Sequence, residues 1–328
     1  MTRPPIDIAA VNRTPPAVID GERSLAVALA CLFGLAVGDA LGAPVEFLSR
    51  MEIEERYGSA GIQKFEPWGG HPAGSYTDDT QMSLATARGI VRAVRTGGEP
   101  AALVHEEYEI WLATQDDPDE ARAPGATCVA VLSDGVRGTL AEAINESKGC
   151  GGAMRTAPVG IVYLPGDAFR VGAELAAITH GHPSGYLPGG FIAETIAHLR
   201  LGKTLARSIS SALRVLQTWP RCGETADRIG LARTLLAGGV SPARALPALG
   251  QGWTGDEAIG LAVYCALKAA ERLSVKATAA QKTAAFRRGV LMAVNITGDS
   301  DSTGSITGAL LGTALGFEAI PKEWVRHV

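Results

Sequence analysis

The sequence has little of what marks secreted, membrane-spanning or nucleic-acid-binding proteins. Its five cysteines are widely spaced and form no C-x-x-C pair, which argues against a disulfide framework or a zinc knuckle and favours a reducing cytoplasm. The formal net charge is -4, so no basic surplus is available to neutralise a nucleic-acid backbone. The first residues lack an apolar signal segment, and the longest uncharged stretch, residues 24–38, is shorter than the roughly 18 to 20 residues of a bilayer-crossing helix. We therefore expect a cytoplasmic protein that contacts neither nucleic acid nor membrane.

Enough apolar material is present for one large core. Hydrophobic residues make up 46% of the 328 residues and charged residues 20%, as in a globular protein. Residues 1–23 carry two Pro-Pro pairs and no helical period, which predicts an extended N-terminal arm outside the core. No repeat or composition shift divides the rest, so we expect a single domain over residues 24–328.

Apolar residues after the arm recur with helical spacing, and no comparable set of alternating segments predicts strands. The expected fold class is all-α. The expected helices are 24–41, 78–94, 101–114, 171–178, 191–199, 208–216, 256–273 and 283–294, with a last helix after Asp301.

Glycine is unusually frequent, with 40 of 328 residues, or about 12% against a typical 7% or so. We expect the excess in loops at residues 58–74, 149–152, 181–190 and 250–255, where the missing Cβ lets the backbone approach a ligand in a cleft. In the last expected helix, four glycines recur every four residues and share one face, which predicts close packing of a neighbouring helix. They are Gly304, Gly308, Gly312 and Gly316.

Two clusters of acidic and hydroxyl residues stand just before expected helices: Thr77-Asp78-Asp79-Thr80 and Asp299-Ser300-Asp301-Ser302-Thr303. Adjacent carboxylates repel one another unless a cation neutralises them, and oxygen ligands without histidine or cysteine suit magnesium or manganese. For either cluster alone, helix capping and metal binding fit equally well. Two clusters, each denser than a cap requires, favour a dinuclear site where carboxylates from distant helices meet. We expect Asp299 and Asp301 to turn towards one point from an irregular loop.

A third segment, residues 38–47, carries two further acids. An apolar helix acquires Asp39 and then breaks at Gly42 and Pro44. Glu46 is therefore expected on a loop near the helix end, within reach of a metal or its water. Asp39, near the end of a helix, is interpreted as a solvated or capping group.

A glycine-rich loop and a histidine segment complete the candidates. Successive amides of Lys148 to Gly152 could cradle a diphosphate at a helix N-terminus, although the segment matches no Walker or dinucleotide fingerprint and could be an ordinary loop. His180 and His182 lack the cysteine or H-E-x-x-H context of a zinc site, which favours ordinary polar contacts. Tyr186 either stacks on a base or belongs to the core.

Taken together and in order, these segments resemble the ADP-ribosylglycohydrolase family. The matching strings are GDALGAPVEF, YTDDTQMSLA, RAPGATC, GCGGAMR, THGHPSGYL and GDSDSTG, which span residues 38–305. The resemblance implies an all-α fold with two magnesium ions, or manganese, at the bottom of a cleft. It implies Glu46, Asp78 and Asp79 as catalytic residues. It implies as metal ligands Thr77, Asp78, Asp79, Asp299, Asp301 and Ser302. The implied substrate-binding residues are Ser147, Lys148, Gly149, Cys150, Gly151, Gly152, Met154, His180, Tyr186 and Gly255.

Within the family, a GDSDS ending together with the TH-x-HP-[ST]-GYL segment is similar to bacterial-type hydrolases of arginine-linked ADP-ribose. The resemblance therefore implies that the substrate is an ADP-ribosylated protein and that the bond broken is the N-glycosidic link to an arginine side chain. Two alternatives stay open. One is hydrolysis of another ADP-ribosyl linkage, on serine or a small metabolite. The other is an immunity-type protein that also binds and blocks an ADP-ribosyltransferase, with residues 1–23 as a docking arm.

Overall fold

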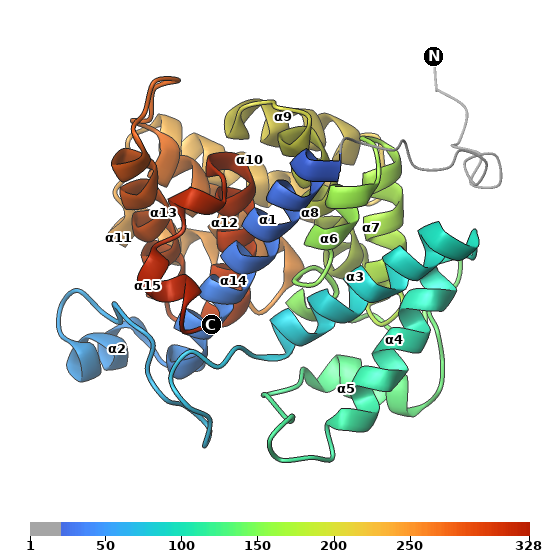
Figure 1. Ribbon diagram of the computed structural model, residues 1–328. Helices are drawn as coiled ribbons and strands as arrows, with labels where there is room; N and C mark the ends of the chain where they lie inside the picture. The colour runs from blue at the N-terminus through green and yellow to red at the C-terminus, as the bar shows by residue number, and fades with distance from the viewer. Residues whose placement is uncertain (1–20) are drawn as a thin grey trace.

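The computed structural model describes residues 21–328, and helices are the only regular elements in this range (Figure 1). This confirms the expected all-α fold class. Of the expected arm, residues 1–20 lie outside the described residues, and residues 21–23 are the first residues of helix α1. The helices are α1 Gly21–Gly42, α2 Arg50–Tyr57, α3 Asp78–Thr96, α4 Pro100–Thr114, α5 Ala126–Ser133, α6 Ala157–Val162, α7 Asp167–Ala177, α8 Pro183–Arg200, α9 Leu205–Leu216, α10 Gly223–Ala237, α11 Pro242–Leu249, α12 Gly255–Ala270, α13 Ala279–Val294, α14 Ser300–Leu315 and α15 Lys322–Val325.

Helices α1 and α14 cross in the middle of the molecule, where glycines of both helices face one another (Figure 1). A Cβ added at Gly308 would lie 1.9 Å from the carbonyl oxygen of Gly34, and one added at Gly38 would lie 2.0 Å from that of Gly304. The expected close packing on the α14 glycine face is therefore confirmed, and its partner is α1. Gly316 does not belong to this face because it is the residue that ends α14, with a φ of +90°.

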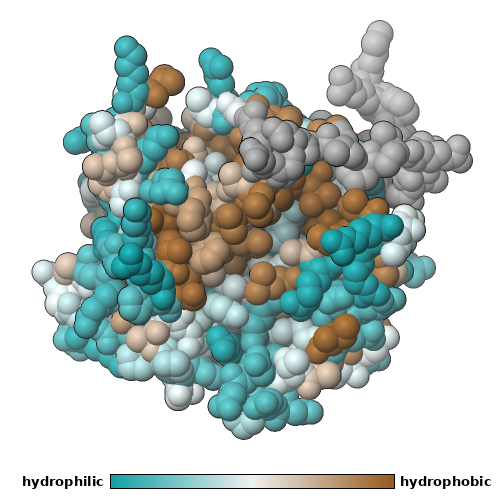
Figure 2. All heavy atoms as spheres, in the orientation of Figure 1, coloured by the Kyte–Doolittle hydropathy of each residue, from teal (hydrophilic) through white to brown (hydrophobic). Residues whose placement is uncertain are grey.

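Helix α1 is apolar over most of its length. By length and composition, Leu25–Val45, 21 residues, could also cross a membrane. The expectation from residues 24–38 that the apolar stretch is too short is therefore wrong, because the single charge of Asp39 does not end it. An apolar window of this segment is 61% buried among the other helices, as expected of a core helix. Hydrophobic residues gather in the middle of the face shown in Figure 2, where Figure 1 places α1.

The expected glycine loop over residues 181–190 is wrong, because α8 begins at Pro183 and includes its later glycines. These glycines allow α7 to approach α8 closely. A Cβ at Gly190 would lie 2.7 Å from the carbonyl oxygen of Phe169, and one at Gly189 would lie 3.0 Å from the Cβ of Ala176. Glycine here serves helix packing rather than a ligand cleft.

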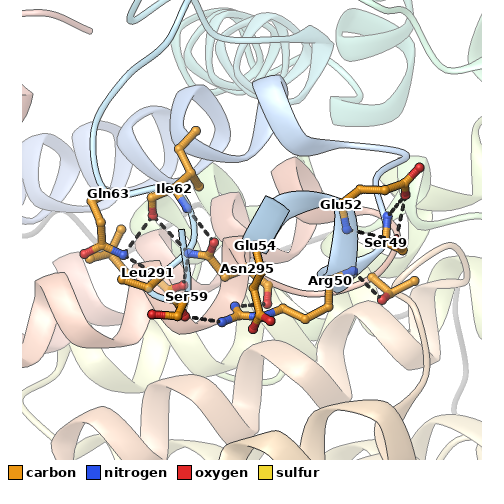
Figure 3. Close-up of polar contacts among 11 residues, drawn as sticks. Ser49, Arg50, Glu52, Glu54, Ser59, Ile62, Gln63, Leu291 and Asn295 are labelled. Atoms are coloured by element: carbon orange, nitrogen blue, oxygen red, sulfur yellow. Dashed lines mark hydrogen bonds and ion pairs between the residues drawn. The ribbon is translucent and has the colours of Figure 1, made fainter. Parts of the chain in front are cut away.

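Helix α2 and the loop after it are fastened to the segment that leads into α14 (Figure 3). Arg50 donates a hydrogen bond from its backbone amide to Thr297 Oγ1 at 2.9 Å and one from its guanidinium to the Asn295 carbonyl oxygen at 2.8 Å. The Asn295 side chain accepts from the amide of Ile62 and donates to its carbonyl oxygen, at 2.8 and 3.0 Å. These bonds fix the chain that follows Glu46 against the chain that precedes Asp299.

Candidate active site

The structure brings the two acidic clusters together, although they are 223 residues apart in the sequence. Thr77 and Asp299 are the N-cap residues of α3 and α14. Ser302 Oγ donates a hydrogen bond across the two helix ends to Asp79 Oδ2 at 3.2 Å. Each residue of the expected metal-ligand set, Thr77, Asp78, Asp79, Asp299, Asp301 and Ser302, is at most 4% exposed.

Thr77 and Asp299, which belong to the two acidic clusters, also cap the helices that follow them. Thr77 Oγ1 accepts from the amide of Asp79, and Asp299 Oδ1 accepts from the amide of Ser302, at 3.3 and 3.2 Å. The expected irregular loop around Asp299 and Asp301 is wrong, because α14 begins at Ser300. The first turn of that helix directs Asp301 towards α3, and helix N-termini favour negative charge.

Burial and mutual repulsion raise the pKa values of these carboxyl groups. Burial raises the pKa of Asp78 to about 8, with Asp301 adding to the shift and the amide of Gly125, 2.9 Å from Oδ2, opposing it. The pKa of Asp79 lies well above its usual range because the group is buried and because Asp301 is close. The pKa of Asp301 is raised by burial and then by Asp299. Protonation of a carboxylate or binding of a cation would therefore stabilise the cluster.

Asp39 is the residue of this cluster that sequence reasoning missed. It is fully buried at the end of α1, and its carboxylate accepts from the amide of Thr77 at 2.8 Å and from the amide and hydroxyl of Thr80 at 3.0 and 2.5 Å. Burial and the nearby Asp301 raise the pKa of Asp39 to about 7. The expected capping role was partly right, but Asp39 caps another helix, α3, and so positions Thr77 and its neighbours.

Glu46 lies at the rim of the cluster, directly after the short 3-10 helix Ala43–Val45. Its amide donates to the carbonyl oxygen of Gly42 at 3.0 Å, which turns the chain back towards the start of α14. Burial, followed by the charges of Asp301 and Asp299, raises the pKa of Glu46 to about 11. A carboxylate in such surroundings accepts a proton readily.

The residues present fit a divalent cation. Asp79 Oδ1 and Asp301 Oδ1 are buried without a hydrogen-bond partner, and buried carboxylate oxygens without a partner are costly unless a cation pairs with them. Within residues 21–328, no three His, Cys, Asp or Glu side chains enclose a metal position as they stand. A cation here would therefore also use oxygens such as the hydroxyl groups of Thr77 and Ser302, as magnesium often uses few carboxylates together with water.

The expected diphosphate loop lies beside the carboxylates. The expected helix N-terminus is wrong, because only the short 3-10 helix Cys150–Gly152 begins here and α6 starts at Ala157. Cys150 Sγ donates to Asp299 Oδ2 at 2.7 Å, and the Cys150 amide donates to the carbonyl oxygen of Trp253 at 3.2 Å. The amide of Gly255 donates to the Lys148 carbonyl oxygen at 2.8 Å. The Lys148 ammonium pairs with Glu224 at 2.8 Å and is already neutralised there. Backbone amides are therefore the groups of this loop that could contact a phosphate.

The glycines of this loop pack against His180, which is 2% exposed. A Cβ at Gly149 would lie 3.0 Å from His180 Nε2, and one at Gly151 would lie 3.2 Å from Cys128 Sγ and from His180 Cε1. Burial, followed by the charge of Arg155, lowers the pKa of His180 to about 3, so the ring is neutral. Close packing is thus a sufficient reason for glycine here, and a ligand contact of His180 stays a prediction.

Of the remaining expected substrate-binding residues, Met154 contacts the carboxylate cluster directly. Met154 Sδ lies 3.9 Å from Ser302 Oγ, and Ser147 Oγ lies 3.3 Å from Thr127 Oγ1. Tyr186 is partly buried against the main core cluster. His182 accepts from the amide of Ser184 as the N-cap of α8, which agrees with an ordinary polar role.

Comparison with known proteins identifies relatives over nearly the whole chain. The family model described as ADP-ribosylglycohydrolase matches residues 21–328. The ADP-ribosyl-[dinitrogen reductase] glycohydrolase of Rhodospirillum rubrum is 29% identical over 314 residues, covering 92% of this chain and 90% of that protein. The ADP-ribosylarginine hydrolase Tri1 of Serratia proteamaculans is 25% identical, covering 95% and 78%. A solved structure titled "ADP-ribosylglycohydrolase-related protein complex" aligns with a TM-score of 0.65 at 22% identity, covering 94% and 93%.

Proposed function

Because this chain belongs to the ADP-ribosylglycohydrolase family, we propose that it hydrolyses the N-glycosidic bond between ADP-ribose and arginine side chains of modified proteins. The observation that carries the proposal is the pair of buried acidic helix ends, with Asp79 and Asp301 oxygens left without partners and Glu46 at their rim. The arginine linkage is named for one relative, the hydrolase Tri1, and is suggested here by the GDSDS and THGHPSGYL segments.

Hydrolysis at ribose C1 passes through a transition state with oxocarbenium character, so the protein has to hold the ribose, deliver water and let the guanidine nitrogen leave. We assign Asp78, Asp79, Asp299 and Asp301, with the hydroxyl groups of Thr77 and Ser302, to holding two magnesium ions. When bound, such ions orient ribose hydroxyls and lower the pKa of a coordinated water.

Glu46 would accept the proton of the attacking water. Burial and the charges of Asp301 and Asp299 raise its pKa, and a bound cation would offset these charges and leave the carboxylate free to take up a proton. The thiol of Cys150 would keep Asp299 in place. The amides of Gly151 and Gly152, in the short 3-10 helix Cys150–Gly152, would face the diphosphate, since those of Gly149 and Cys150 donate to Ser147 and Trp253.

One assay tests the proposal. The protein is incubated with arginine-ADP-ribosylated and, in parallel, serine-ADP-ribosylated protein, each with magnesium, with manganese and with a chelator, and released ADP-ribose is measured. We expect metal-dependent release from the arginine-linked substrate. Release from the serine-linked substrate alone would contradict the arginine linkage and assign the protein to serine-linked ADP-ribose. No release from either would favour a binding role, such as blocking an ADP-ribosyltransferase.

A further inference from the structure

An exposed aromatic pair stands at the rim of the carboxylate cluster. The rings of Phe47 and Trp253 are stacked, with centroids 5.2 Å apart and an interplanar angle of 23°. Phe47 is 71% exposed and Trp253 is 37% exposed. The pair therefore leaves much aromatic surface in contact with water, which the core does not require.

Both rings are attached to backbone that belongs to the site. Phe47 follows Glu46 and has a φ of +69°, a left-handed conformation that bulky residues rarely adopt and that clusters at functional sites. The Trp253 carbonyl oxygen accepts from the Cys150 amide. The preceding residue, Gly252, lies so close to Asp299 that an added Cβ would be 3.1 Å from its carbonyl oxygen. The backbone that carries both rings is thus held against the segments that carry the carboxylates.

One ring of the pair, that of Phe47, also borders open space. A hollow of about 620 Å³ is lined by Glu46, Phe47 and Trp68, among others, and it gives a polypeptide room next to the cluster. Arg56 lines the same hollow, with its guanidinium 5.3 Å from the centre of the Tyr57 ring.

We propose that Phe47 and Trp253 bind the guanidinium group of the ADP-ribosylated arginine and thereby select the arginine linkage. This inference rests on the proposed function, since it assigns the leaving-group side of the same site. A guanidinium is planar, charged and weakly hydrated, and it stacks on aromatic faces. A serine hydroxyl offers neither charge nor a plane, so the pair would discriminate against it.

Binding of the released side chain tests the inference without relying on turnover. Wild-type protein saturated with ADP-ribose is titrated with Nα-acetyl-arginine amide and, separately, with its neutral citrulline counterpart, and binding is followed by saturation-transfer NMR. We expect binding of the arginine derivative and much weaker binding of the citrulline derivative. Phe47→Leu and Trp253→Leu, which keep apolar bulk but remove the ring, should weaken arginine binding by about 3- to 30-fold.

Two control variants separate loss of the aromatic ring from a general effect of substitution. Phe47→Tyr retains a ring and should retain affinity, and Ile110→Ala removes an apolar side chain of α4 that is 56% exposed and should change nothing. Equal binding of the two derivatives, or unchanged affinity in both leucine variants, would overturn the inference. If the wild type binds the guanidinium but releases no ADP-ribose from arginine-linked protein, the proposed function fails, and only the binding of a guanidinium by the two rings stands. If it hydrolyses that substrate with the same KM in Phe47→Leu, the inference alone fails.

Discussion

Magnesium binding to this protein should depend strongly on pH between 6 and 8. Burial raises the pKa of Asp39 to about 7 and that of Asp78 to about 8, and both groups also feel Asp301. Unfolded aspartates titrate near 3.9, so the folded, metal-free protein binds more protons than the unfolded chain between about pH 4 and 8. Stability contributed by these protons is present at low pH and is lost as pH rises through the folded pKa values. Each extra proton changes the free energy of unfolding by about 1.4 kcal/mol per pH unit.

A divalent cation that binds these carboxylates displaces their protons, so its affinity rises as pH rises, whereas the stability of the metal-free protein falls. For every proton displaced, the apparent affinity should rise about tenfold per pH unit. With Asp78 largely protonated at pH 6.5 and less so at 7.5, we expect at least a severalfold, and with Asp39 included a more than tenfold, tighter dissociation constant at the higher pH.

Titration calorimetry measures both quantities. Runs at pH 6.5 and 7.5, each in two buffers of different ionisation enthalpy, give the affinity and the number of protons released, which we expect to be about one to two at pH 6.5. Thermal unfolding with and without magnesium provides a second readout, with the larger stabilisation at pH 7.5. An affinity that does not change with pH, together with no proton release, would refute the assignment of the cation to these carboxylates.

Three substitutions extend the reasoning. Asp301→Asn should abolish metal-dependent ADP-ribose release yet raise, or at least not lower, the unfolding temperature without metal, because it removes a repelling buried charge; a large loss of stability would contradict this. Asp39→Asn should lower magnesium affinity about 10- to 100-fold in calorimetry, because residues that orient ligands typically have such effects; wild-type affinity would count against its positioning role. Gly308→Ala should cost roughly 3 kcal/mol or more in denaturant unfolding, since its Cβ would meet the Gly34 carbonyl oxygen at 1.9 Å. Gly230→Ala, in open space on α10, is the control and should be neutral or stabilising by up to about 1 kcal/mol.

The long apolar helices could be predicted because their buried residues recur with helical spacing in the sequence. The segments at α1, α3, α4, α12 and α13 were all located, with ends shifted by a few residues. Short or polar helices such as α2, α5, α10 and α11 were missed, because their sequences carry few core residues. Helix α8 was located only in its second half, because three glycines near its start are typical of a loop until the close approach of α7 is known.

The candidate site was predictable as a set of residues but less so as an arrangement. That carboxylates of distant helices meet was inferred from charge density alone, and Ser302 Oγ indeed contacts Asp79. Asp39 could not be identified because its partners, the amides of Thr77 and Thr80, are about 40 residues away. The stacking of Phe47 on Trp253 has no local signal either, since each is an isolated aromatic residue.

The glycine contact between α1 and α14 links the stability of the core to the chemistry at its end. The same crossing that seats Gly308 on Gly34 continues to Gly42, where an added Cβ would lie 2.4 Å from the Cα of Asp301. The last turn of α1, which carries Asp39, is therefore held against the first turn of α14 by backbone packing. Repelling carboxylates would move apart on flexible loops, but here rigid helix ends keep them together. Loosening this crossing, as in Gly308→Ala, should consequently lower magnesium affinity as well as stability, although that residue lies two helical turns from the acids.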